Sequence, residues 1–202
     1  MVSRSGRYAV SVLVACVLLA GCQPANIPLP APTPSLRCTA EAGGAEYDCT
    51  PYEYDDMVAK DKLYAEAEAV YRKFLAEDVR VLRAGGASAA TPVLRETTTG
   101  AFLADTMDYY RSLKDQRSTL VGGEVRLTAL VRQPGIAKGG SVVALKACID
   151  ASSARIRMDG RDGGPGRKGS DVLYFGRIDG LLKIQGAEGK EGNECGCDGL
   201  RA

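Results

Sequence analysis

The apolar residues of this chain change their spacing at Gly122-Gly123, and that change limits the folds open to it. Before the two glycines, apolar residues between 63 and 75 recur three and four positions apart, which is typical of one face of a helix. After them, apolar and polar residues alternate over 124–132, which is typical of a half-buried strand. Helices followed by strands predict an α+β domain with an antiparallel sheet and the helices on one face.

Local signals place the helices. Thr50 and Glu53 have the spacing of a capping box, and Pro51 suits the first helical position. The expected apolar face consists of Leu63, Ala67, Val70, Tyr71, Phe74 and Leu75. A second helix is expected after the threonines at 97–99, and its apolar face consists of Leu103, Met107, Tyr110 and Leu113.

About four strands are expected, over 124–132, 142–150, 172–178 and 181–184. The strand over 142–150 is almost continuously apolar, which predicts a central position covered on both faces. Asp179-Gly180 predicts the turn of the last hairpin.

Two further segments lack a regular strand pattern. Residues 154–158 continue the central strand irregularly, and residues 159–170 predict a long glycine-rich loop. Asp159 and Asp162 give that loop a faint likeness to a cation-binding loop, but the regular aspartate spacing and closing glutamate of an EF-hand are missing. A flexible hairpin loop is therefore the favoured interpretation.

The first residues have the pattern of an export signal. Arg4 and Arg7 precede an apolar run over 9–19 that is short for a membrane span. Leu19-Ala20-Gly21-Cys22 resembles the bacterial lipobox, which implies a signal peptide over 1–21 and an N-palmitoyl, S-diacylglycerol cysteine at Cys22. Two or more acyl chains hold a protein stably on a bilayer, so we expect a membrane-anchored protein that faces the extracytoplasmic side.

The rest of the chain divides into a tether, a domain and a tail. Residues 22–49 hold the lipidated cysteine, five alternating prolines that favour an extended tether, and a short cysteine-bounded loop. A globular domain is expected over 50–197, followed by a tail over 198–202.

Composition removes several classes of function. Loss of residues 1–21 takes two of the 26 basic residues and leaves the 25 acidic ones, so the mature net charge is −1 and a nucleic-acid partner is not expected. The chain has no histidine, which excludes Ser-His-Asp and Cys-His catalytic sites and histidine-based zinc sites. No motif indicates a cofactor, a metal or a catalytic residue.

The cysteines of an exported chain are expected to form disulfides. Cys38 and Cys49 bracket a loop with no strong element of its own, and we predict a local bridge between them. Cys148 is predicted to pair with Cys195, with Cys197 as the alternative partner. Cys195-Gly196-Cys197 could instead bind a soft metal or be redox-active, but Cys-x-Cys alone is a weak signal.

The order of elements resembles the NTF2-like cone fold, in which a long first helix packs inside a curved antiparallel sheet. With the lipobox, the proline-rich linker, the strand Ala147-Cys148-Ile149-Asp150 and the late Cys195, the chain resembles small lipoproteins of actinobacteria that carry such a domain. The resemblance covers Thr50 to Cys195. It departs from the pattern in the extra Cys197 and in the absence of an aromatic residue at 181–182.

The resemblance implies a pocket, and two kinds of function follow. The favoured expectation is a non-catalytic binding module for a small apolar ligand or an envelope protein. The alternative is an isomerase- or dehydratase-type enzyme, which needs a carboxylate in an apolar pocket and a hydrogen-bond donor. Residues of the required types are Asp105, Tyr109, Tyr110 and Asp150, although the usual histidine of the dehydratases is missing.

Overall fold

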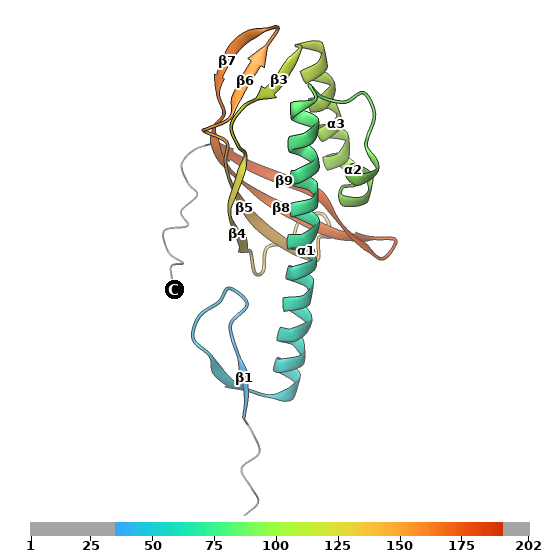
Figure 1. Cartoon of the computed structure of the whole chain (residues 1–202). Helices are drawn as coiled ribbons and strands as arrows, with labels where there is room; N and C mark the ends of the chain where they lie inside the picture. The colour runs from blue at the N-terminus through green and yellow to red at the C-terminus, as the bar shows by residue number, and fades with distance from the viewer. Residues whose placement is uncertain (1–34, 192–202) are drawn as a thin grey trace, which may run out of the picture. The chain divides into compact units, whose positions relative to one another are not determined.

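The computed structural model describes residues 35–191, of which the last two are described by their backbone alone. The described residues fold into helices and three antiparallel sheets (Figure 1). The predicted α+β class is therefore confirmed, and the main sheet has the expected four strands, but two smaller sheets accompany it. The predictions for the signal peptide, for Cys22, for the prolines up to Pro34 and for Cys195 and Cys197 fall outside the described residues.

Helix α1 (Pro51–Arg83) is the longest element of the described part. The capping box at its start is confirmed, because the Glu53 amide donates to Thr50 Oγ1 at 3.3 Å and the Thr50 amide donates to Glu53 Oε2 at 2.8 Å. The predicted apolar stripe is also confirmed. Its members are all buried in the core or packed against it, Tyr64 joins it, and Val81 extends it toward the end of the helix. No helix in residues 35–191 is both long and apolar enough to cross a bilayer.

Two shorter helices follow and lie beside α1. Thr91 caps α2 (Pro92–Thr97) by accepting a hydrogen bond from the Leu94 amide at 3.1 Å. Helix α3 (Gly100–Asp115) starts after Thr99 and turns its predicted face, which includes buried Met107 and Tyr110, into the core.

The main sheet has the strand order β4-β5-β8-β9 and lies behind α1 in Figure 1. Its strands are β4 (Arg126–Arg132), β5 (Val143–Asp150), β8 (Lys168–Ile178) and β9 (Leu181–Glu191). Strand β5 is central, and residues of both its faces, such as Leu145 and Cys148, are fully buried, as expected. Asp179 and Gly180 both have positive φ in the β8–β9 turn, which confirms the predicted hairpin.

The alternation predicted for β4 is wrong in its second half. The pairing with β5 shifts by one residue between Leu127 and Ala129, which is a β-bulge. A one-residue shift exchanges the two faces of a strand. Leu130 therefore packs against the core. Unbroken alternation from Leu127 would instead have placed Ala129 and Val131 on that face.

The predicted glycine-rich loop is wrong over most of its length. Residues Arg161–Pro165 form β7, which pairs with β6 (Arg155–Met158), and β3 (Ser118–Val121) completes this second sheet in the order β3-β6-β7. Two backbone hydrogen bonds link the second sheet to the main one, from the Ala151 amide to Arg167 O at 3.0 Å and from the Gly166 amide to Ala154 O at 2.9 Å. The pairs β5–β8 and β6–β7 thus form one long hairpin that bends between the two sheets.

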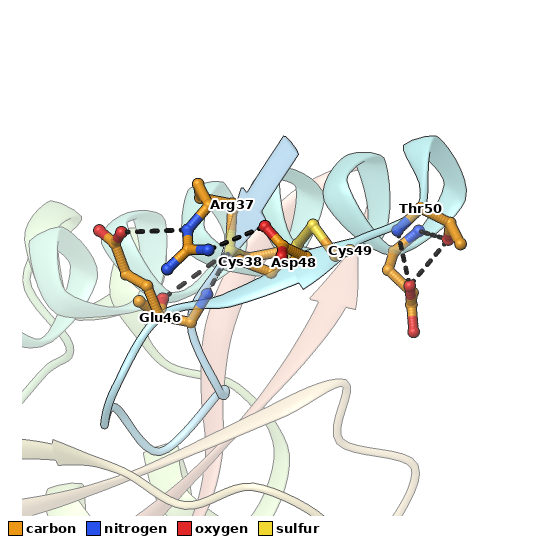
Figure 2. Close-up of a disulfide and its surroundings, with 9 residues drawn as sticks. Arg37, Cys38, Glu46, Asp48, Cys49 and Thr50 are labelled. Atoms are coloured by element: carbon orange, nitrogen blue, oxygen red, sulfur yellow. Dashed lines mark hydrogen bonds and ion pairs between the residues drawn. A yellow bond between two sulfur atoms is a disulfide. The ribbon is translucent and has the colours of Figure 1, made fainter. Parts of the chain in front are cut away.

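The segment before α1 is a small hairpin of β1 (Leu36–Cys38) and β2 (Tyr47–Cys49), where no regular element was expected. The predicted disulfide between Cys38 and Cys49 is confirmed, with the Cα atoms 5.8 Å apart (Figure 2). An exposed ion pair between Arg37 and Asp48 at 2.8 Å accompanies it. The loop of the hairpin contacts α1, because the Tyr64 hydroxyl donates to Glu41 Oε1 at 2.7 Å.

Candidate functional site

A cavity of about 1260 Å³ lies between α1, α3 and the two larger sheets. This volume exceeds the range of about 300–1,000 Å³ that is typical of small-molecule sites. Most of its wall is apolar. Representative lining residues are Phe74, Leu75 and Leu82 of α1, Phe102 of α3, Ile149 of β5 and Leu173 of β8.

The bend in the long hairpin forms one wall of this cavity. Ala151, Gly166 and Arg167 all line it, and they are the residues that link the two sheets. A Cβ atom on Gly166 would lie 2.3 Å from the Ala151 carbonyl oxygen, so only glycine allows the two strands to approach this closely. The backbone therefore determines the shape of this wall.

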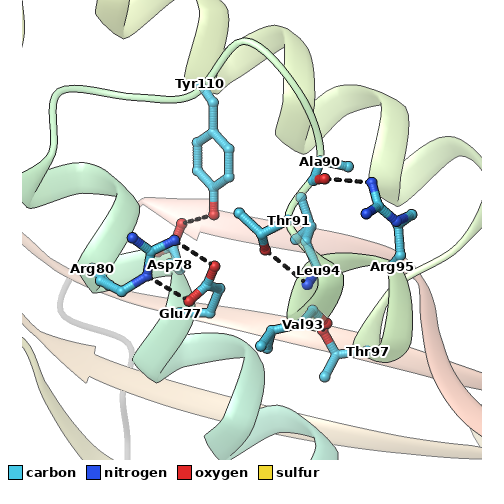
Figure 3. Close-up of polar contacts among 10 residues, drawn as sticks. All are labelled: Glu77, Asp78, Arg80, Ala90, Thr91, Val93, Leu94, Arg95, Thr97 and Tyr110. Atoms are coloured by element: carbon cyan, nitrogen blue, oxygen red, sulfur yellow. Dashed lines mark hydrogen bonds and ion pairs between the residues drawn. The ribbon is translucent and has the colours of Figure 1, made fainter.

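An aspartate of α1 is placed between the cavity and the core. Asp78 lines the cavity and accepts a hydrogen bond of 2.8 Å from the hydroxyl of the fully buried Tyr110 (Figure 3). Burial raises the pKa of Asp78 to about 6, although the hydrogen bond from Tyr110 opposes the shift. The neighbouring Glu77 instead faces Arg80 at 2.7 Å, which holds the pKa of Glu77 below its usual value.

A second aspartate lines the cavity from the start of β8. Burial raises the pKa of Asp171, and the negative charge of Asp171 in turn raises the pKa of Asp78. Within residues 35–191 the Asp171 carboxylate has no hydrogen-bond or ion-pair partner. The two acids therefore carry a mutual repulsion that no cation in the described part offsets by direct contact.

Two lining residues with hydroxyl groups are almost fully buried. Tyr71 lines the cavity and is 3% exposed. Burial raises the pKa of its phenol, and the negative charges of Asp171 and Asp78 raise that pKa further. The phenol is therefore neutral at ordinary pH. Ser118 of β3 is also 3% exposed, and its Oγ atom has no hydrogen-bond partner among the described residues. A buried hydroxyl without a partner is costly and uncommon in proteins.

The structure separates the four residues that the sequence indicates. Asp105 and Tyr109 line the cavity from α3, where both are exposed. Tyr110 contributes from behind the wall through its bond to Asp78. Asp150 is not a lining residue. Its carboxylate accepts hydrogen bonds from the amide and hydroxyl of Ser152, which, with nearby Lys168, lower its pKa to about 2.

Asp78, Asp171 and Ser118 line the cavity but are not among the residues that the sequence indicates. A signal existed for Asp78, because it continues the apolar stripe of α1 four residues after Phe74, and a polar residue at a core-facing position is unusual. Asp171 and Ser118 gave no such signal, since nothing in the sequence marks where β8 and β3 begin.

The basic residues of the lining are Arg167 and Lys168. The Lys168 ammonium is paired with Asp150 at 3.2 Å, and Arg167 also has interactions of its own. In the described part of the chain, no group of three or more histidine, cysteine, aspartate or glutamate residues is arranged to hold a metal ion. The groups that could act chemically in the cavity are therefore carboxylates and hydroxyls, set in a largely apolar wall.

Comparison with known proteins adds no relative. No protein-family model matches the chain, and no curated protein matches its sequence significantly.

Proposed function

We propose that this protein is a lipid-anchored, extracytoplasmic binding protein of the NTF2-like kind, which takes up a small and mostly apolar ligand in its cavity. The observation that carries the binding function is the partly open cavity of about 1260 Å³ between helices and sheets, with a largely apolar wall. Burial of apolar ligand surface in such a space supplies the main driving force for binding.

The proposed anchor rests on the sequence Leu19-Ala20-Gly21-Cys22 after a short apolar run. The disulfide between Cys38 and Cys49 supports an oxidising compartment, because such bonds are rare in the reducing cytosol. Mass spectrometry of the protein extracted from membranes tests the anchor. We expect an N-terminal Cys22 that carries acyl chains, and an unmodified residue at that position contradicts it.

The proposed NTF2-like relationship rests on architecture. Long α1 packs against an antiparallel sheet, a second helix lies beside it, and a partly open cavity lies between them. The second sheet formed by β3, β6 and β7 gives the cavity an additional wall. A fold of this kind supports many functions, so the ligand must be argued from the cavity itself.

A pair of tryptophan variants tests ligand binding. Leu75 lines the cavity, whereas Ala76, the next residue of α1, is exposed. We expect Leu75→Trp to fill part of the space and to weaken binding of the neutral fluorescent probe N-phenyl-1-naphthylamine at least tenfold, while Ala76→Trp leaves it unchanged. Fluorescence titration of the purified full chain measures both. Equal affinities for the two variants would show that the probe binds elsewhere and would contradict the proposal.

A second candidate function is proton transfer to or from a carbon next to a carbonyl group. The observation that favours it is Asp78, whose pKa of about 6 suits a general base near neutral pH and whose partner Tyr110 fixes its orientation. In this reaction the Asp78 carboxylate would take a proton from the carbon and return it to the resulting enolate.

Isotope exchange tests the catalytic candidate without a known substrate. The ketone 2-tetralone in D₂O exchanges its α-protons slowly, and a base in an apolar cavity accelerates the exchange. NMR spectroscopy is expected to show faster exchange with the protein than with Asp78→Asn. Equal rates for the two proteins would exclude Asp78 as the base.

A further inference from the structure

The polar groups of the cavity indicate the charge of its ligand. We infer that the ligand is an apolar molecule with a protonated amine, for which Asp78 and Asp171 supply the counter-charge. This inference rests on the proposed binding function and names the class of ligand for the same cavity.

Two carboxylates in the cavity carry an unbalanced negative charge. Asp78 lines the cavity from α1 and Asp171 lines it from β8, and the charge of Asp171 disfavours the ionised form of Asp78. Neither forms an ion pair within residues 35–191. A cation placed in the cavity would interact favourably with both, and charge-assisted hydrogen bonds are the strongest that such groups form.

The other charged groups of the lining do not reverse the preference of the cavity for a cationic ligand. Lys168 is neutralised by Asp150 at 3.2 Å, and Arg167 has interactions of its own. Asp105, which also lines the cavity, adds a third negative charge at an exposed position. Tyr71 and Tyr109 both have a raised pKa and remain neutral, so they contribute no opposing charge.

Three probes with one skeleton test the inference on the purified full chain: 2-naphthylmethylamine, 2-naphthylmethanol and 2-naphthoate. We expect calorimetric titration at about pH 7.5 to give at least tenfold tighter binding of the amine than of the alcohol, and weaker binding of the carboxylate. Asp171→Asn should reduce binding of the amine about tenfold and leave binding of the alcohol unchanged.

Asp108→Asn is the matched control. It makes the same chemical change on α3, outside the lining, at a residue whose partner is Arg111 at 2.9 Å. Asp78→Asn provides a second test of the carboxylate pair, since asparagine keeps an oxygen that can accept the Tyr110 hydrogen bond.

The outcomes separate the two proposals. If the alcohol binds as tightly as the amine, or if Asp171→Asn weakens both equally, the inference of a cationic ligand is wrong while the cavity remains a binding site. Preference for the carboxylate would also overturn it. If none of the probes binds, and Leu75→Trp likewise has no effect on the neutral probe, the proposed function itself fails.

Discussion

The hydroxyl of Tyr110 on α3 donates a 2.8 Å hydrogen bond to Oδ1 of Asp78 on α1, and this bond joins the core to the cavity. Tyr110 is fully buried, so no water can take the place of the carboxylate as the hydrogen-bond acceptor for its hydroxyl. The two helices are thereby fixed relative to each other by a polar contact as well as by apolar packing.

Removal of this hydroxyl should change the ionisation of Asp78. In Tyr110→Phe we expect the pKa of Asp78 to rise above about 6, because the hydrogen bond that favours the carboxylate is lost. The free energy of unfolding near neutral pH should fall by about 2 kcal/mol. NMR titration of the aspartate carboxyl groups and urea unfolding measure the two effects. Tyr109→Phe is the control, because Tyr109 is exposed and forms no hydrogen bond through its hydroxyl in the described part; a similar change there would contradict the assignment.

The raised pKa of Asp78 predicts the pH dependence of stability. The folded protein holds this proton up to about pH 6, whereas an unfolded aspartate releases it near 3.8. The contribution of Asp78 to stability is therefore fully present below about pH 3.8 and is lost as the pH rises through about 6, amounting to about 3 kcal/mol. Asp171 acts in the same direction, because its pKa is also raised.

Urea unfolding from about pH 4 to about pH 7 measures this loss. Asp78→Asn, which does not titrate, should show a clearly smaller decrease over the same range. A decrease equal to that of the unchanged protein would mean that Asp78 ionises with an ordinary pKa in the folded state.

Two adjacent glycines allow the energetic cost of a left-handed backbone to be measured separately from the cost of a steric clash. Gly122 and Gly123 have nearly the same positive φ, 63° and 64°. A Cβ on Gly123 would lie 2.0 Å from the Ser153 carbonyl oxygen, whereas a Cβ on Gly122 has nothing within 4 Å. Gly122→Ala should cost about 1 kcal/mol for the left-handed conformation alone, and Gly123→Ala should cost about 2 kcal/mol more. Equal losses in urea unfolding would show that the loop moves freely away from Ser153.

The disulfide is expected to stabilise the hairpin before α1. It closes a loop over a sequence separation of 11 residues, which corresponds to about 3 kcal/mol. The double variant Cys38→Ala, Cys49→Ala should lose about this much and should exchange the amides of 36–49 faster, with α3 unchanged. Asp48→Asn is the control, because it removes only an exposed ion pair with Arg37, worth well under 1 kcal/mol. Unchanged amide exchange in the double variant would contradict the prediction.

The sequence predicts those elements whose signals are local. The capping box of Thr50 and Glu53, the stripe around Tyr71 and the Asp179-Gly180 turn each depend on neighbouring residues, and all three occur as expected. Strand β7 could not be predicted in this way. Its sequence RDGGP has no apolar alternation, and it becomes a strand only because it continues the hairpin between β6 and β8.

The candidate site was predictable only in part for the same reason. Asp105 and Tyr109 were predictable because the apolar spacing of helix α3 is a local signal. Asp171 reaches the cavity through the pairing of β8 with distant β5, and that pairing begins inside a segment that the sequence presents as a loop. The bulge in β4 likewise depends on its partner strand rather than on its own residues.

The disulfide between Cys38 and Cys49 also determines how the domain responds to a pulling force. A tension applied at Ser35 passes from Cys38 to Cys49 through the covalent bond and enters the first turn of α1 directly. The residues between the two cysteines, which could otherwise extend by roughly 35 Å, remain unloaded. The connection to the helix therefore stays short and stiff for as long as the bond is oxidised, and reduction would add that length of slack chain.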